Sequence, residues 1–328
     1  MNTAKRRSLI FLAIVAALSA VLETMMIRQG MSSRSFGLPL VFWLMWCPTL
    51  AAVVTALATR KRWREFGWRL PRLKYMLAAW LVPIAYATLA YGTVWLTGLG
   101  GVPKATFLER AAITLGMQGK PQGLIIAAAF AYIATSVTLF SCISAAGEEI
   151  GWRGFWVPEL TAWLGFRRAA LFSGAFWALW HTPGIIFGEY NAGTPRWFEV
   201  PCFVALVVSM GIFYAWMRLK SDSVWPCVVL HASHNAIIQV LYDRITVDKG
   251  HTLWFTTEFG IALVIPAVLI AAWCWKRSGE VALGHSQPIN APGKMEHHDS
   301  QKRSKRDGRE NSAPHTHMAS NEYGCALF

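Results

Sequence analysis

Apolar runs long enough to cross a lipid bilayer recur along most of this chain. A helix needs about 17–25 mainly apolar residues to span the hydrocarbon core, and candidate runs fall at residues 8–27, 38–59, 75–97, 124–147, 169–187, 201–219, 224–242 and 255–275. Only 15% of the 328 residues are charged and 54% are hydrophobic, whereas a soluble domain carries about 25% charged residues. The sequence therefore predicts an all-α fold, a polytopic membrane bundle of about eight transmembrane helices.

The predicted bundle occupies residues 1–275, and residues 276–328 follow as a tail. This tail is rich in Ser, Asn, His, Lys and Arg and shows almost no apolar periodicity. It cannot bury enough surface to fold, so we expect a disordered basic segment. Its last four residues, Cys325 to Phe328, form a C-a-a-X pattern of the kind that directs prenylation. A four-residue pattern also arises by chance, and we favour that interpretation.

Two local features refine the predicted helices. The helix of the fourth run can continue beyond residue 147 through "EEIGWRGFWVPEL", and we expect Pro158 to stop it. The long connection 98–121 contains "FLERAAITLGM", which predicts an amphipathic helix lying at the membrane surface.

The formal net charge of +13 is distributed unevenly. When eight spans are threaded alternately, most cations fall on one side, including Lys5, Arg6, Arg7, the cluster between residues 60 and 74, Arg167, Arg168, Arg218, Lys220, Lys276 and Arg277. The positive-inside rule then places both termini in the cytoplasm. We expect an integral protein of a bacterial plasma membrane that contacts anionic lipid, with no nucleic-acid partner.

Polar side chains interrupt three of the apolar runs. They are Glu148, Glu149 and Arg153 after the fourth run, His181 in the fifth, and His231, His234 and Asn235 in the seventh. Ionisable residues at membrane depth are rare, usually face the interior of a bundle, and often mark a functional site.

The spacing of these residues is helical. Glu149 and Arg153 are four residues apart and can pair on one face, as can His231 and Asn235. Glu148 lies about 100° around the helix from Glu149, so the two carboxylates have different surroundings. We predict that Glu148 faces a shared cavity and that Arg153 holds Glu149, because a guanidinium stays charged and grips a carboxylate.

Each group taken alone has a passive interpretation. A buried Glu–Arg pair often serves only packing or register, and a lone buried histidine is commonly a hydrogen-bonded packing residue. The combination favours function, because three separate spans each contribute a Glu, His or Asn although those spans carry little other charge.

The three groups together resemble the motifs of a known family. "EEIGWR" is similar to EExxxR, "WALWH" (Trp177 to His181) to an aromatic residue followed by His, and "HASHN" (His231 to Asn235) to HxxxN, the motifs of the CPBP family of CAAX prenyl proteases type 2 and Abi proteins. Their order also agrees, and the resemblance covers about residues 124–242. His234 matches no motif position.

The resemblance implies an eight-helix intramembrane endopeptidase. By position it assigns Glu148 as the general base, His181 as its partner on the attacking water, and His231 and Asn235 as oxyanion donors. Glu149 and Arg153 become supporting residues. Peptide hydrolysis needs a base, a proton for the leaving amine and donors for the developing oxyanion, which these residue types can supply in a hydrated pocket.

A metal-dependent variant of this chemistry stays open. Glu148, His181 and His231 also form a possible zinc set of the His₂Glu type, although the chain lacks HExxH, the usual zinc-protease motif. The six cysteines show no CxxC pairing and indicate neither a disulfide framework nor a thiolate site. We therefore favour water activation without a cofactor, with zinc as the alternative.

The expected substrate is a membrane-associated peptide or protein, including a prenylated one, cleaved near its C-terminus. One alternative is a non-catalytic relative that acts as a bacteriocin-immunity protein or a membrane scaffold and uses the same cavity for binding. Another is a small proton-coupled transporter, but that function does not explain why Asn235 lies one turn from His231.

Overall fold

The computed structural model describes residues 2–30, 33–35 and 38–282. The predicted disordered tail and its C-a-a-X end lie outside the described residues from residue 283 onward. Within the described part, residues 276–282 complete helix α12 (Ile261–Lys276) and form the short helix α13 (Gly279–Ala282).

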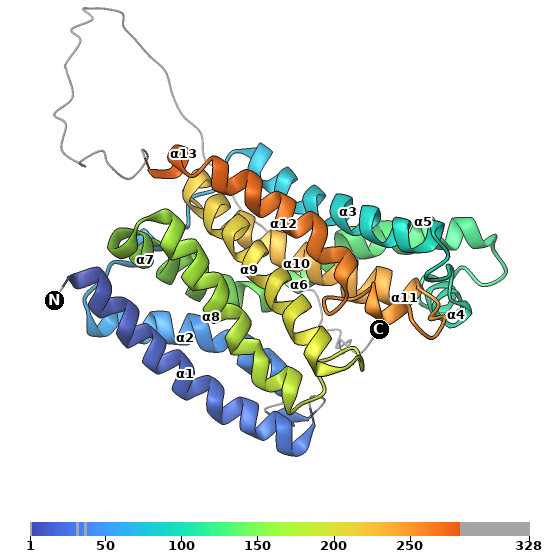
Figure 1. The fold of residues 1–328 in the computed structure, drawn as a ribbon, viewed down its shortest axis with the longest axis horizontal. Coiled ribbons are helices and arrows are strands. Elements are labelled where there is room, and N and C mark those ends of the chain that lie inside the picture. The colour runs from blue at the N-terminus through green and yellow to red at the C-terminus, as the bar shows by residue number, and fades with distance from the viewer. Residues whose placement is uncertain (1, 31–32, 36–37, 283–328) are drawn as a thin grey trace, which may run out of the picture. The chain divides into compact units, whose positions relative to one another are not determined.

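The described chain is almost entirely helical, as predicted (Figure 1). Besides α12, its long helices include α1 (Thr3–Gln29), α2 (Leu40–Ala58), α3 (Leu73–Leu96), α8 (Phe166–Ile186) and α9 (Arg196–Ser221). A continuous helix runs from α10 (Trp225–Asn235) through a π-helical segment (Ala236–Tyr242) into α11 (Asp243–Ile245). The only strands in the described part form a small ribbon, β1 (Arg34–Ser35) with β2 (Leu38–Pro39).

Five helices of the described part are long and apolar enough to cross a membrane. They are Thr3–Gln29, Leu40–Ala58, Leu73–Leu96, Gln122–Leu164 and Arg196–Ser221. Helix α12 is apolar but shorter, and the helices that carry His181 and His231 do not belong to this group. A membrane helix bundle is therefore confirmed, while the number eight stays a prediction.

The fourth run is part of a helix of 43 residues, Gln122–Leu164. It consists of α5 (Gln122–Tyr132), a π-helical segment (Ile133–Val137), α6 (Thr138–Glu149), a second π-helical segment (Ile150–Trp156) and α7 (Val157–Leu164). The prediction that Pro158 stops this helix was wrong. A new α-helical register starts at Val157, so Pro158 occupies a first-turn position that needs no intrahelical donor. The helix ends instead at Gly165, whose φ is 75°.

The last predicted span, 255–275, also begins later than expected. Residues 252–254 form a 3₁₀ turn, residues 255–260 form a loop, and α12 starts only at Ile261. Thr257 has a φ of 65°, which is incompatible with a right-handed helix. The loop turns Glu258 into the protein, where side chains of the helix that starts as α10 and of the loop after α8 satisfy it. These tertiary hydrogen bonds outweigh the local apolar pattern.

The connection 98–121 contains the predicted helix. It is α4 (Ala105–Thr114), and it buries Phe107, Ala111 and Ala112 against the bundle. Its placement at the membrane surface stays a prediction.

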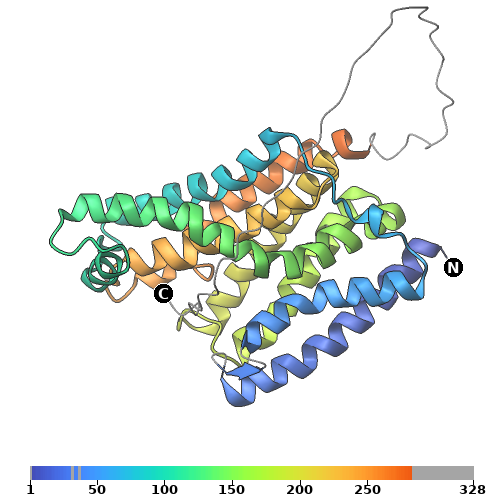
Figure 2. The ribbon, with the colours of Figure 1, turned by 180° about the vertical axis from the view of Figure 1, so that it is seen from behind.

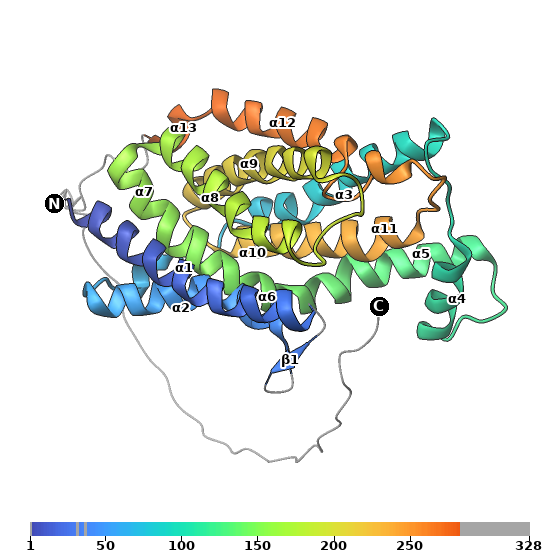
Figure 3. The ribbon, with the colours of Figure 1, turned by 60° about the horizontal axis from the view of Figure 1, so that its bottom comes forward.

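Helix α6 packs between α2 and α10 (Figures 2 and 3). Gly147 and Gly151 make this contact close, because a Cβ at Gly151 would lie 2.3 Å from the backbone carbon of Pro48. Thr49 Oγ1 also donates to the carbonyl of Gly147 at 2.6 Å. Small residues spaced four apart let two helix backbones approach in this way, and the approach fixes how residues 148–153 are turned.

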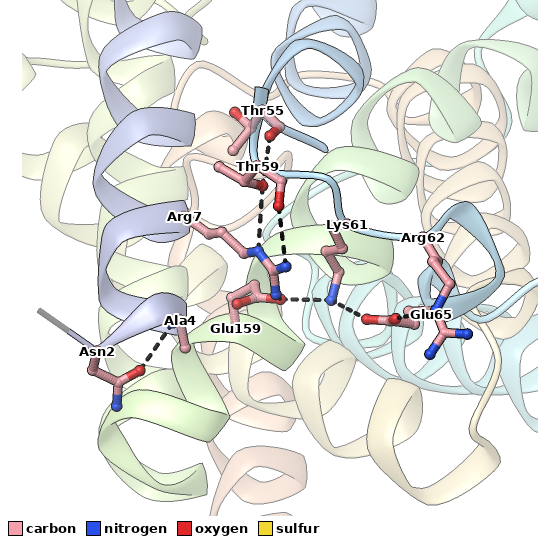
Figure 4. A network of polar contacts seen from close by, with 9 residues as sticks. All are labelled: Asn2, Ala4, Arg7, Thr55, Thr59, Lys61, Arg62, Glu65 and Glu159. Carbon is pink, nitrogen blue, oxygen red and sulfur yellow. Dashed lines mark hydrogen bonds and ion pairs between the residues drawn. The ribbon is translucent and has the colours of Figure 1, made fainter. Parts of the chain in front are cut away.

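A polar network ties α1, α2 and α7 together at one end of the bundle (Figure 4). Lys61 Nζ lies 2.5 Å from Glu159 Oε1 and 2.9 Å from Glu65 Oε2. Arg7 reaches the same Glu159 oxygen at 3.5 Å and also donates to Thr59. The side chains of Lys61 and Glu159 are each 6% exposed, so this contact pairs two buried charges.

Candidate active site

The four residues assigned to chemistry line one cavity of about 350 Å³: Glu148, His181, His231 and Asn235. They come from α6, α8 and α10, three helices that are distant in sequence. Much of the remaining lining is apolar or aromatic, including Val41, Leu44, Phe203 and Leu206. The structure therefore brings together the predicted set in a hollow where polar interactions are strong because water is limited.

Glu148 is oriented by a tryptophan of the second motif. The indole Nε1 of Trp177 donates to Glu148 Oε2 at 2.8 Å, and Glu148 is only 2% exposed. Trp177 is the aromatic residue of "WALWH", four positions before His181, so this motif supplies both a donor for the carboxylate and an imidazole.

His181 is held by its own helix. Its Nδ1 lies 2.8 Å from the backbone carbonyl of Trp177, which can only accept, so Nδ1 carries the proton and donates. The neutral ring then presents Nε2 as an acceptor. The ring is also packed edge-on against Trp180, at 4.8 Å between centroids, and against Phe203 at 5.4 Å. These contacts restrict its rotation.

Glu149 and Arg153 lie behind the cavity wall and do not line it. Arg153 Nη1 donates to Glu149 Oε1 at 2.9 Å, and His231 Nδ1 lies 3.0 Å from the same oxygen. The guanidinium is stacked between two rings, 4.0 Å from the centroid of Trp177 and 4.5 Å from that of Tyr214. Glu149 therefore orients His231 in addition to pairing with Arg153, a role that the sequence did not predict.

Asn235 is the last residue of α10, one turn beyond His231, and π-helical geometry begins directly after it. Its amide forms no hydrogen bond with any of the residues that the structure describes. A second π-helical segment begins after Glu149. Such segments commonly mark functional sites, because they re-aim the side chains next to them.

Sequence reasoning missed a second polar cluster on the cavity wall. Glu258 Oε1 lies 2.8 Å from His234 Nε2, and Glu258 Oε2 accepts from Tyr190 at 2.6 Å and Gln239 at 2.9 Å. The other nitrogen of His234 bonds the hydroxyl of Tyr86. The side chain of His234, left without a role by the motifs, thus fixes the 255–260 loop. The sequence offered one signal for this cluster, the carboxylate of Glu258 near the start of the apolar run 255–275.

The possible zinc set is not gathered into a metal-binding group in this arrangement. Across residues 2–30, 33–35 and 38–282, no three His, Cys, Asp or Glu side chains are placed to hold one ion. Nδ1 of His181 and Nδ1 of His231 are also engaged with protein acceptors, which leaves only Nε2 of each ring for a ligand.

Comparisons with known proteins bear on the same region. Residues 121–237 match the family model described as type II CAAX prenyl endopeptidase Rce1-like. A protein named CAAX prenyl protease 2 from Methanococcus maripaludis is 29% identical over 133 residues, which cover 39% of this chain and 46% of that protein. The chain thus matches about half the length of this relative. The matched segment contains Glu148, His181 and His231, and it confirms the resemblance to the CPBP family.

Proposed function

We propose that this chain, whose motif core is similar to the type II CAAX prenyl endopeptidases, is an intramembrane endopeptidase. The observation that carries the proposal is the convergence of Glu148, His181, His231 and Asn235 on one cavity, from three helices. Two packing histidines, a carboxylate and an amide without a joint role would not need to line one hollow.

In the proposed reaction, a water molecule attacks the scissile carbonyl carbon. Glu148 takes one proton from this water, while the unprotonated Nε2 of His181 accepts a hydrogen bond from it and orients it. The C–N bond of the tetrahedral intermediate then breaks, and Glu148 returns the proton to the leaving amine. A base positioned in this way contributes about 10²–10⁴-fold to a rate.

The developing oxyanion needs hydrogen-bond donors. The Asn235 amide supplies one. Nδ1–H of His231 donates to Glu149, whose negative charge stabilises the protonated ring, so that Nε2–H can donate into the cavity. Removing one oxyanion donor costs about 10²–10³ in kcat in well-studied hydrolases.

The proposed substrate is a membrane-associated peptide or protein cleaved near its C-terminus, including a prenylated one. The cavity supports this class because an apolar lining and a few placed polar groups suit a chain delivered from the bilayer.

The test is cleavage of fluorogenic C-terminal reporter peptides, with and without a prenyl group, by purified protein in nanodiscs. We expect Glu148→Gln and His181→Ala each to lower kcat by at least about 10²-fold. Glu109→Gln on the exposed face of α4 is the matched control and should cleave normally. Cleavage retained in both site variants would overturn the mechanism. Peptide binding that survives Glu148→Gln, without any cleavage by the natural protein, would instead indicate the immunity or scaffold function.

Metal dependence needs a separate measurement. We expect full activity after dialysis against a chelator, and no stoichiometric zinc by elemental analysis of active protein. Activity lost on chelation and restored by zinc would make Glu148, His181 and His231 ligands, with Nε2 as the coordinating atom of each ring.

A further inference from the structure

A second hollow, which shares no lining residue with the candidate active site, lies between α3, α9 and α12. Its volume is about 720 Å³. Helix α12 packs on both α3 and α9, and Figure 1 shows all three on the same side of the bundle. Apolar side chains such as Ala78, Val82 and Leu269 line much of this hollow, and none of the proposed catalytic residues lines it. We call it the α3–α9–α12 groove.

Three cations gather at one end of this groove. Lys74 lies in the first turn of α3, Lys220 near the end of α9, and Arg277 directly after α12. Glu280 is the one carboxylate among the lining residues, and it lies 2.8 Å from Lys220 and 3.4 Å from Arg277. Three cations against one carboxylate leave a net charge of +2 at this end.

Helix electrostatics explains only two of these cations. Lys220 and Arg277 lie at helix C-termini, where positive charge is favourable. Lys74 instead lies at the positive N-terminal end of α3, whose first turn contains no acidic residue. Its ammonium lies 5.1 Å from the centroid of the Tyr75 ring and forms no ion pair among the described residues, and both this charge and the N-terminal end of the helix favour an anion.

Aromatic residues line the groove beneath the cations. Trp273 packs edge-on against Trp216, with 5.1 Å between ring centroids, and Arg277 lies 4.4 Å from the centroid of Trp273. Trp216 is only 6% exposed, and its indole N–H has no hydrogen-bond partner in the described part of the chain. This nitrogen has almost no accessible surface, and the indole nitrogens of Trp46, Trp152 and Trp156 also have no partner in the described part of the chain, so the ligand of the groove is inferred from its cations and its apolar wall.

We propose that the α3–α9–α12 groove binds an anionic phospholipid. The phosphate lies among Lys74, Lys220 and Arg277, and one acyl chain follows the apolar part of the groove. The positive-inside rule assigns this end to the cytoplasmic leaflet, where anionic lipids are enriched. A basic pocket between transmembrane helices above an apolar groove is the arrangement that holds such headgroups.

Native mass spectrometry of the full chain can test this site. Protein from nanodiscs containing equal amounts of dioleoyl phosphatidylglycerol and dioleoyl phosphatidylcholine is expected to retain one phosphatidylglycerol. The variant K74Q/K220Q/R277Q should weaken its binding by about tenfold or more, since each cation near a headgroup contributes about 1 kcal/mol. The matched control R62Q/R64Q/R69Q removes three exposed cations from the 60–74 cluster and should retain the lipid. Equal loss in both variants would overturn the proposal.

Two further experiments distinguish a lipid site from a site that binds only a phosphate group. Ala78→Trp fills the groove without changing its charge, and we expect it to expel the lipid although Lys74, Lys220 and Arg277 remain. Glycerol phosphate at millimolar concentration should not displace the lipid. If it does, the cations take a phosphate group alone and the proposed lipid site is wrong. Unfolding temperatures of all variants in pure phosphatidylcholine, where the site has no anionic ligand, should agree and thereby show intact folds.

Discussion

Glu149 Oε1 lies 3.0 Å from Nδ1 of His231 and 2.9 Å from Nη1 of Arg153. One oxygen thus joins the cavity-lining imidazole to a cation stacked behind the wall. All three side chains are at most 6% exposed, so the contact is made away from bulk water. The orientation of a proposed oxyanion donor therefore depends on a carboxylate that never reaches the cavity.

Glu149→Gln tests this dependence. We expect the free energy of unfolding to fall by about 3–5 kcal/mol, because Arg153 is left as an uncompensated buried charge. We also expect kcat to fall with little change in KM, because a neutral amide no longer stabilises a protonated His231. Unfolding in detergent and steady-state cleavage measure the two effects.

The control for this variant is Glu199→Gln. Glu199 is also fully buried and pairs with an arginine, Arg196, but it does not line the cavity. It should lose less stability, since the side chain of Arg196 is 43% exposed and can be hydrated. Its kcat should be unchanged. An equal loss of kcat in both variants would show that Glu149 acts only through stability.

Trp177→Phe isolates the donor that holds Glu148. Phenylalanine keeps a ring beneath Arg153 but removes the indole N–H that lies 2.8 Å from Glu148 Oε2. We expect kcat to fall about tenfold or more, because a misplaced catalytic group loses rate steeply. Trp180→Phe is the matched change, since its N–H donates to Ser19 Oγ instead. Trp180→Phe should lower the free energy of unfolding by about 1 kcal/mol. The prediction fails if Trp177→Phe and Trp180→Phe show the same kcat.

Gly151→Ala tests the close contact of the motif helix with α2. The added methyl group would lie 2.3 Å from the backbone carbon of Pro48, so the helices must separate. We expect destabilisation of about 1–3 kcal/mol or more and reduced cleavage, because Glu148 and Arg153 lie within three residues. Gly92→Ala near the C-terminal end of α3 meets nothing within 4 Å. It should raise stability by up to about 1 kcal/mol, and a stabilised Gly151→Ala would refute the packing argument.

The network of Figure 4 predicts a pH dependence of stability. Burial alone would raise the pKa of the Glu65 carboxyl, but the hydrogen bond and charge of Lys61 outweigh it and hold this pKa below its ordinary value of 4.5. The ionised form is therefore favoured by folding, so its contribution is complete above pH 4.5 and is lost as the pH falls through the lower folded pKa.

Glu65→Gln should accordingly be less stable than the natural protein at pH 6, and the difference should vanish as the pH falls well below 4.5. Thermal unfolding of both proteins across this range measures it, with Glu109→Gln as an exposed control. A difference that is constant with pH would show that ionisation of Glu65 does not matter. The effect is small, because half-exposed ion pairs contribute at most about 1 kcal/mol.

Glu148, His181, His231 and Asn235 line one cavity, and helical spacing could predict within each segment which side chains share a face. The i,i+4 pair Glu149–Arg153 and the separate direction of Glu148 followed from this geometry alone. The contact between Glu149 and His231 did not, because it joins residues 82 positions apart. Glu258, Tyr190 and Gln239 were missed for the same reason.

Local patterns also gave wrong boundaries where tertiary contacts decided them. Pro158 was expected to end a helix that continues to Leu164, since a change from π- to α-helical register places the proline in a first turn. Residues 255–260 were expected to be helical, but hydrogen bonds from His234 and Gln239 on one helix and from Tyr190 in the loop after α8 draw Glu258 inward.

By itself, the sequence determined an apolar helical bundle and the chemical groups of its site, since hydrophobicity and helical period are properties of neighbouring residues. Tertiary structure alone decided which oxygen meets which nitrogen, where the helices approach through Gly147 and Gly151, and that a loop brings Glu258 to the cavity wall. Those features depend on distances between segments far apart in the chain, and no local pattern records them.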